Sequence, residues 1–102
     1  VPVFRSHSES INLETRTPLT PQQVREILSQ SPGVIVQDDP ANNVYPMPLF
    51  TSNKDEVFVG RIRRDLTNDN GIAMWVVADQ IRKGAATNAV QIAEYLYLNK
   101  FF

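Results

Sequence analysis

The segment Ile72–Ala78 constrains the fold most, because every one of its residues is apolar. A strand that is apolar on both sides needs cover on both faces of its sheet. The segment Glu56–Leu66 is predicted to be a neighbouring strand. Residues 68–71 supply the turn between the two, with Asn70 or Gly71 able to adopt a positive φ angle. We therefore expect a hairpin whose second strand is covered on both faces.

Two further strands are predicted ahead of this hairpin. Apolar and polar residues alternate through Ser8–Thr15, the period-two pattern of a half-buried strand. Val34–Val36 is a short apolar strand. Residues 38–48 contain three prolines. Because proline fixes φ and removes an amide donor, we expect irregular structure in that stretch.

The first predicted helix begins after Thr20, which can serve as its N-cap. Pro21 takes the first helical position, and Gln23 completes a capping box. The Ser-Pro-Gly sequence at residues 31–33 ends this helix. A second helix is predicted over about residues 82–98, because apolar residues recur there at steps of three or four: Ile81, Ala85, Ala89, Ile92 and Leu96.

The predicted order of elements is strand, helix, strand, loop, strand, strand, helix. The chain has 102 residues, which fits one domain. This order predicts an α+β fold with a mostly antiparallel sheet and helices on one face. The last helix opens with the small residues 84–86, which let another backbone or a ligand approach closely. The carboxyl end, residues 95–102, is more apolar than a free terminus usually is, and we expect a docking surface there.

The charge pattern argues against a nucleic-acid partner, and the lengths of the apolar runs argue against a membrane-spanning helix. The formal net charge is −1, and the densest basic cluster, Arg61, Arg63 and Arg64, is followed at once by Asp65. A nucleic-acid binder needs a sustained positive patch. No apolar run approaches the roughly 20 residues that span a bilayer. The amino terminus has neither a Met nor a signal-peptide pattern, so we expect the chain to be cut from a longer one.

The chain contains no cysteine. This favours a reducing compartment, here the cytoplasm, and it excludes thiolate catalysis and cysteine-based zinc sites from these residues. One histidine and scattered carboxylates give little basis for any other metal site, so none is predicted. Neither a G-x-S-x-G nucleophile motif nor a glycine-rich phosphate loop occurs.

Two polar residues are candidates for a functional site. His7 is the only histidine, and histidine is the residue type that most often serves in acid–base chemistry. The alternative for His7 is a surface or capping role. Asn88 follows the small residues of the last helix. It is either a solvent-facing helix residue or an amide in cleared space, where it can pair with another amide.

Five collinear segments together resemble the aspartate-semialdehyde dehydrogenase family in its bacterial form. The resemblance covers nearly all 102 residues and matches about the last third of a family member. It is carried by Ser6–Ser10, by Asp38–Pro40 with Asn43–Pro48, by Asp55–Asp65, by Met74–Asp79, and by Arg82–Ala86 continuing through Gln91–Glu94.

The resemblance implies a fold and an activity. Residues 1–102 would be the C-terminal part of the catalytic and dimerisation domain of a glyceraldehyde-3-phosphate-dehydrogenase-like enzyme. The last helix, at about residues 82–98, would pack on a nucleotide-binding domain outside the chain. The family reduces β-aspartyl phosphate to aspartate semialdehyde with NADPH and releases phosphate. This reaction serves the biosynthesis of lysine (through diaminopimelate), threonine and methionine, and a homodimer is implied as well.

The resemblance also implies residue roles. His7 matches the family's acid–base histidine, which takes the proton of a nucleophilic cysteine. Asn88 falls where the family's last helix contacts the nicotinamide end of NADP. The family's substrate-binding arginine would lie just before Val1, so Arg5 does not take that role.

Two parts of the family's machinery are missing from the chain, namely the cysteine and the dinucleotide-binding loop. We therefore expect the chain to be inactive by itself. The alternative hypothesis is a free-standing, non-catalytic dimerisation or partner-binding module.

Overall fold

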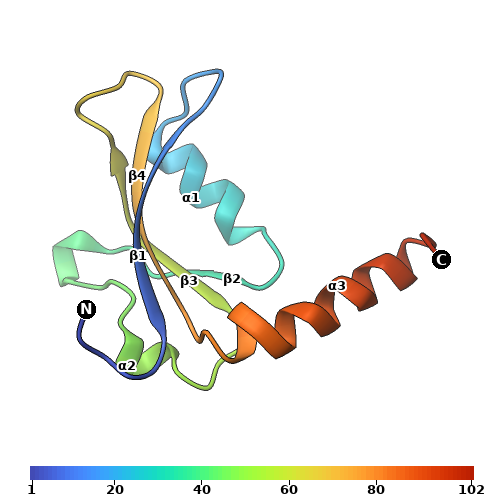
Figure 1. Cartoon of the computed structure of the whole chain (residues 1–102). Coiled ribbons are helices and arrows are strands. Elements are labelled where there is room, and N and C mark those ends of the chain that lie inside the picture. Colours follow the sequence, from blue (N-terminus) through green and yellow to red (C-terminus); the bar gives the residue numbers. More distant parts are fainter.

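A four-stranded sheet organises the chain, and the computed structural model describes all of its residues, Val1–Phe102. The strands are β1 (His7–Glu14), β2 (Val34–Val36), β3 (Val57–Arg64) and β4 (Gly71–Ala78), in the spatial order β1-β4-β3-β2 (Figure 1). Strand β4 is antiparallel to both β1 and β3, whereas the short β2 is parallel to β3. The predicted α+β fold with a mostly antiparallel sheet is confirmed.

Helix α1 (Pro21–Ser29) covers one face of the sheet. Its start follows the predicted capping box: the Thr20 side chain accepts from the amide of Gln23, and the Gln23 side chain accepts from the amide of Thr20. Val24 is the buried residue of this helix. The hydrophobic core beneath it consists of Val24, Val59, Ile62, Ile72 and Met74. Burial of this apolar surface is the main force that holds α1 on the sheet.

The other face of the sheet is partly covered by the proline-containing segment. Two short helices occur in it, η1 (Pro40–Asn42) and α2 (Pro48–Thr51), where the sequence predicted only irregular structure. Trp75 of β4 donates its indole Nε1–H to the carbonyl of Pro46 over 3.1 Å. Opposite Trp75 in the sheet lies Gly60, which has no side chain to obstruct the segment. Strand β4 therefore has neighbours on both faces, as its apolar sequence predicts.

The C-terminal segment projects away from the sheet. It consists of a short π-helix, η2 (Arg82–Ala86), followed by α3 (Thr87–Leu98), so the predicted helix exists but is not α-helical throughout. None of the residues of α3 is buried. Figure 1 shows α3 extending beyond the body of the protein toward the C-terminus. The radius of gyration is accordingly 14.9 Å, above the about 13 Å expected for a compact chain of this length.

None of the helices combines the length and the hydrophobicity that a bilayer crossing requires.

Candidate functional site

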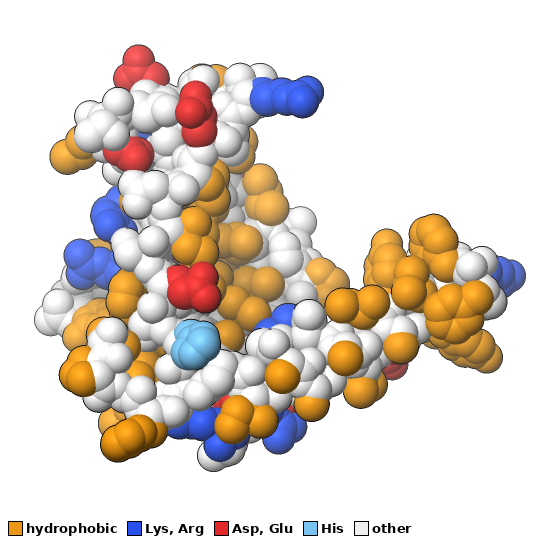
Figure 2. All heavy atoms as spheres, in the orientation of Figure 1, with side chains coloured by type: hydrophobic (Ala, Val, Ile, Leu, Met, Phe, Trp, Pro, Cys, Tyr) orange, Lys and Arg blue, Asp and Glu red, His pale blue; other side chains and the backbone are white.

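His7 is the first residue of β1 and pairs with Ala78, the last residue of β4. The side chain of His7 is exposed, and it makes no hydrogen bond within the chain. Figure 2 shows His7, the only histidine, at the edge of a hollow between the sheet and the C-terminal helix, with hydrophobic side chains inside the hollow. A histidine in this place is free to exchange protons with a group that enters the hollow.

Asp79 follows β4 directly and is completely buried, with 0% of its surface exposed. Arg5 donates to its Oδ2 over 2.9 Å, and the backbone amide of Asn53 donates to the same oxygen over 2.7 Å. Its Oδ1 accepts from the amides of Ile81 at 2.9 Å and Arg82 at 3.2 Å. Asp79 therefore joins three segments that are far apart in the sequence.

Burial by itself would raise the pKa of the Asp79 carboxyl. The hydrogen bonds from Arg5 and from the amides of Asn53, Ile81 and Arg82 outweigh that effect and hold the pKa well below its ordinary value of 3.8. Asp79 is therefore ionised at neutral pH, and these donors stabilise its charge.

Ser6, the residue before His7, is held by contacts near Asp79. Ser6 has a φ angle of 70°, in the left-handed region that non-glycine residues rarely adopt. Its backbone amide donates to the side-chain oxygen of Gln80, and its hydroxyl lies 2.9 Å from that of Ser52. The turn that leads into β1 is thus fastened to the end of β4 and to the segment after α2.

Asn88 lies in the first turn of α3 and is half-buried. The Lys83 ammonium donates to Asn88 Oδ1 over 2.9 Å and to Gln91 Oε1 over 2.7 Å. Because the carbonyl oxygen of Asn88 is occupied in this way, its NH2 group is left to donate to an external acceptor. The exposed residues Gly84–Ala86 lie one turn earlier on the same helical segment.

No hydrogen bond joins the two candidates, His7 and Asn88. They are related through Asp79, which binds the Arg5 side chain in the turn before His7 and the backbone amides at the start of the helical segment that carries Asn88. The sequence interpretation did not identify Asp79. An aspartate that directly follows an apolar strand and precedes a helix by a few residues is an N-cap signal, and that signal could have identified it.

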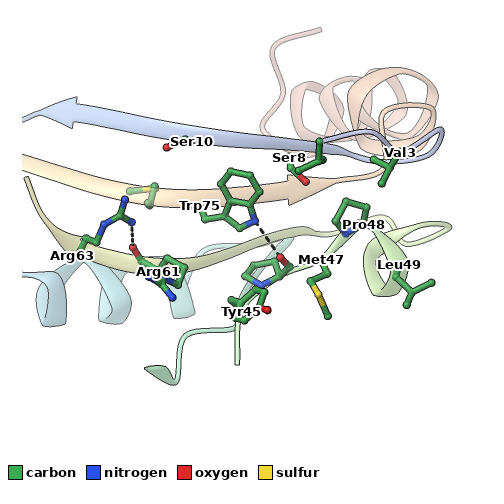
Figure 3. A pocket seen from close by; sticks show the side chains of 13 residues that line it. Val3, Ser8, Ser10, Tyr45, Met47, Pro48, Leu49, Arg61, Arg63 and Trp75 are labelled. Atoms are coloured by element: carbon green, nitrogen blue, oxygen red, sulfur yellow. Dashed lines mark hydrogen bonds between the residues drawn. The ribbon is translucent and has the colours of Figure 1, made fainter. Parts of the chain in front are cut away.

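A cavity of about 540 Å³ lies on the sheet face opposite α1. The indole of Trp75 lies between the strands and the Tyr45–Leu49 segment in Figure 3, and Arg61 and Arg63 border the same cavity. The hydroxyl oxygen of Ser8, which also lines the cavity, is buried without a hydrogen-bond partner. A largely apolar cavity of this kind is typical of a binding surface.

The structure holds no group of three or more His, Cys, Asp or Glu side chains with the arrangement of a metal site.

The family model of the semialdehyde dehydrogenase dimerisation domain matches residues 1–83. The aspartate-semialdehyde dehydrogenase of Aquifex aeolicus is 62% identical over 96 residues, which are 94% of this chain and 28% of the relative. The enzyme of that name from Synechocystis is 49% identical over 96 residues, again 94% of this chain and 28% of the relative. The chain therefore spans little more than a quarter of the length of these curated relatives.

Solved structures agree with the sequence comparisons. The crystal structure of aspartate semialdehyde dehydrogenase II from Vibrio cholerae, complexed with ASA, superposes with a TM-score of 0.87 at 45% identity, over 100% of this chain and 30% of that one. A probable aspartate-semialdehyde dehydrogenase from Pseudomonas aeruginosa gives a TM-score of 0.81 at 32% identity, over 94% of this chain and 28% of that one. The chain belongs to the semialdehyde dehydrogenase dimerisation-domain family, whose model matches residues 1–83, and the relatives it is similar to in sequence and structure are aspartate-semialdehyde dehydrogenases.

Proposed function

We propose that the chain supplies the C-terminal part of the active site of an NADP-dependent aspartate-semialdehyde dehydrogenase, with His7 as its acid–base residue. The observation that carries the proposal is the position of His7, exposed and without a partner beside an apolar hollow, in a chain with 62% identity to a relative of that name. The substrates would be β-aspartyl phosphate in the biosynthetic direction, or aspartate semialdehyde and phosphate in reverse. The cytoplasm is the proposed location, because the chain contains no cysteine.

The proposed role of His7 is proton transfer. Another part of the enzyme would supply the nucleophilic cysteine, because this chain has none. A thiol is mostly protonated at neutral pH, and a neutral imidazole within reach takes its proton and stabilises the thiolate. The same imidazolium then returns a proton to the tetrahedral adduct, as a general acid.

The proposed role of Asn88 is to orient a nicotinamide nucleotide. Its oxygen is occupied by Lys83, so its NH2 group fits the carbonyl oxygen of the nicotinamide carboxamide. The nucleotide supplies the hydride when it is bound, and a hydrogen bond at the carboxamide selects which ring face is presented. We propose NADP as the nucleotide, because the family uses it. We also propose that the last helix (about residues 82–98) packs on a nucleotide-binding domain.

A homodimer is also proposed, through the sheet face that carries the Trp75 cavity. That face is the one not covered by α1, and it is apolar around Tyr45–Leu49. Leu49, with 79% of its surface exposed, lies at its edge. Apolar surface of this extent is stabilised by burial against a complementary surface, and a two-fold dimer provides one.

A chimera tests the proposed activity. The matching segment of the Aquifex aeolicus relative is replaced by this chain, and the phosphate-dependent oxidation of aspartate semialdehyde is followed through NADPH formation. We expect an active chimera in which His7→Ala lowers kcat by about 100-fold or more, the usual effect of losing an acid–base group. Glu14→Gln, an exposed change at the far end of β1, is the control and should leave kcat unchanged.

Two results would contradict the proposal. A near-normal kcat for His7→Ala in an active chimera would remove the acid–base role. A folded but inactive chimera would favour the alternative of a non-catalytic dimerisation or partner-binding module.

A further inference from the structure

Two carboxylates fasten the base of the C-terminal helix to the body of the protein. Asp55, just before β3, accepts from Arg82 Nε over 2.6 Å and from the Thr87 hydroxyl over 3.0 Å. Asp79 accepts from the backbone amides of Ile81 and Arg82. Since α3 has no buried residue, these contacts at η2 set the direction in which α3 and Asn88 point.

Only one of the two carboxylates also holds the segment that leads to His7. Asp79 Oδ2 binds the guanidinium of Arg5 at 2.9 Å from Nε and 2.8 Å from a terminal nitrogen. Gln80, the next residue along the chain, holds the amide of Ser6. Asp55 makes no contact of this kind. Its hydrogen bonds go to the helix base alone.

The position of His7 depends on the contacts that hold the segment before it. Its side chain has no hydrogen bond of its own, so the region that the ring can reach is set by the backbone of residues 5–8. On one side that backbone is paired to β4, and on the other it turns through Ser6 at a φ of 70°. A turn in this region persists only where surrounding contacts hold it. Here Asp79 binds the Arg5 side chain, Gln80 accepts from the Ser6 amide, and the hydroxyls of Ser52 and Thr51 contact that of Ser6.

We propose that Asp79 is a positioning residue which, through one buried carboxylate, places both His7 and the helix that carries Asn88. The inference rests on the proposed function, because it concerns the site that His7 and Asn88 would form. It assigns no chemical step to Asp79, which is completely buried. A displacement of about 1 Å in a reacting group can cost about 100-fold in rate, so a residue of this kind affects catalysis without touching the substrate.

The test uses the active chimera and the substitution Asp79→Asn. The amide keeps the size of the carboxylate but loses its charge and one acceptor. We expect kcat to fall by about 10-fold or more and the KM for the nucleotide to rise, because both placements depend on Asp79. Asp55→Asn is the matched control: it loosens the helix base alone, so the KM for the nucleotide should rise while kcat stays within about two-fold.

A double-mutant cycle separates positioning from general stability. If Asp79 acts through His7, then Asp79→Asn should lower kcat in the parent chimera but not in the His7→Ala background. An equal loss of kcat in both backgrounds would overturn the proposal, as would a normal kcat for Asp79→Asn. Should Asp79→Asn fail to fold, Arg5→Met replaces it. That variant removes the ion pair, keeps the helix contacts, and should lower kcat without changing the KM for the nucleotide.

Failure of the proposed function would be recognised separately. In that case the chimera with Asp79 unchanged is inactive, or His7→Ala leaves its kcat unchanged.

Discussion

At the scale of single residues, a neighbouring charge sets the direction of the Asn88 amide. Lys83 is five positions earlier, which on a regular α-helix would place it well away from Asn88. The π-helical turn η2 widens the helix between them and brings the ammonium onto the amide oxygen. The donor half of the amide is therefore the half available to a ligand.

This orientation leads to a prediction for the cofactor. Asn88→Ala in the chimera should raise the KM for the nucleotide by roughly 3- to 10-fold, the value of one neutral hydrogen bond. Asn88→Asp keeps an acceptor for Lys83 but has no N–H to donate, so it should raise the KM at least as much. Initial-rate kinetics with varied NADP measure both, and an unchanged KM in the two variants would refute the cofactor role.

At the scale of secondary-structure elements, close packing explains why β3 contains a glycine. A Cβ atom at Gly60 would lie 2.2 Å from the carbonyl oxygen of Gln37 and 2.6 Å from Cδ of Pro46. Pro46 belongs to the proline-containing segment and Gln37 immediately precedes it, and the segment is held in turn by the hydrogen bond from Trp75. The segment and the strand therefore fit only if this position has no side chain.

Gly60→Ala should lower the free energy of unfolding by about 1–3 kcal/mol through overpacking, as measured by urea denaturation. Gly84→Ala provides a matched control, because the nearest atom to its added Cβ would be 3.6 Å away. Alanine is the better helix former, so Gly84→Ala should be neutral or stabilising. Equal losses of stability in the two variants would contradict the packing explanation.

Local patterns predicted most of the elements. The alternation in Ser8–Thr15, the apolar run Ile72–Ala78 and the capping box at Thr20 each depend on neighbours in the sequence, and the strands and α1 lie within a residue or two of their predicted bounds. The departures depend on distant contacts. The π-turn η2 is bound by Asp55, 27 residues before Arg82, and the shape of the turn before β1 depends on Asp79. A residue pattern carries no information on such partners.

The candidate site was predicted only in part. His7 and Asn88 were predicted as site residues because each stands out by residue type or by small neighbours, and their roles stay predictions. Asp79 did not stand out, because a single aspartate after a strand is common. Its importance arises from Arg5, which is 74 residues away in the sequence.

At the scale of the whole molecule, apolar surface is exposed in two places. One is the sheet face around the Trp75 cavity. The other is the stretch of residues 95–102, where five large side chains each have more than half of their surface exposed: Tyr95, Tyr97, Leu98, Phe101 and Phe102. Clusters of large, exposed apolar side chains usually mark surfaces that bind another protein surface.

The isolated chain is therefore expected to self-associate. Sedimentation velocity at increasing protein concentration should show a dimer or larger species, and a clean monomer at high concentration would contradict this. Leu49→Glu should weaken the dimer, because it places a charge on the proposed interface. Leu98→Glu is the same substitution on α3. It should leave the dimer intact and reduce only the larger species.

The exposed helix α3 has a consequence for how tightly any partner surface is bound. Its 12 residues are near the length at which an isolated helix is only marginally formed in water. Where the helix is formed in only a fraction of molecules, the apparent affinity for the partner surface is reduced by that same fraction. A substitution that raises the fraction of molecules with α3 formed therefore raises the apparent affinity, although the contact itself is unchanged.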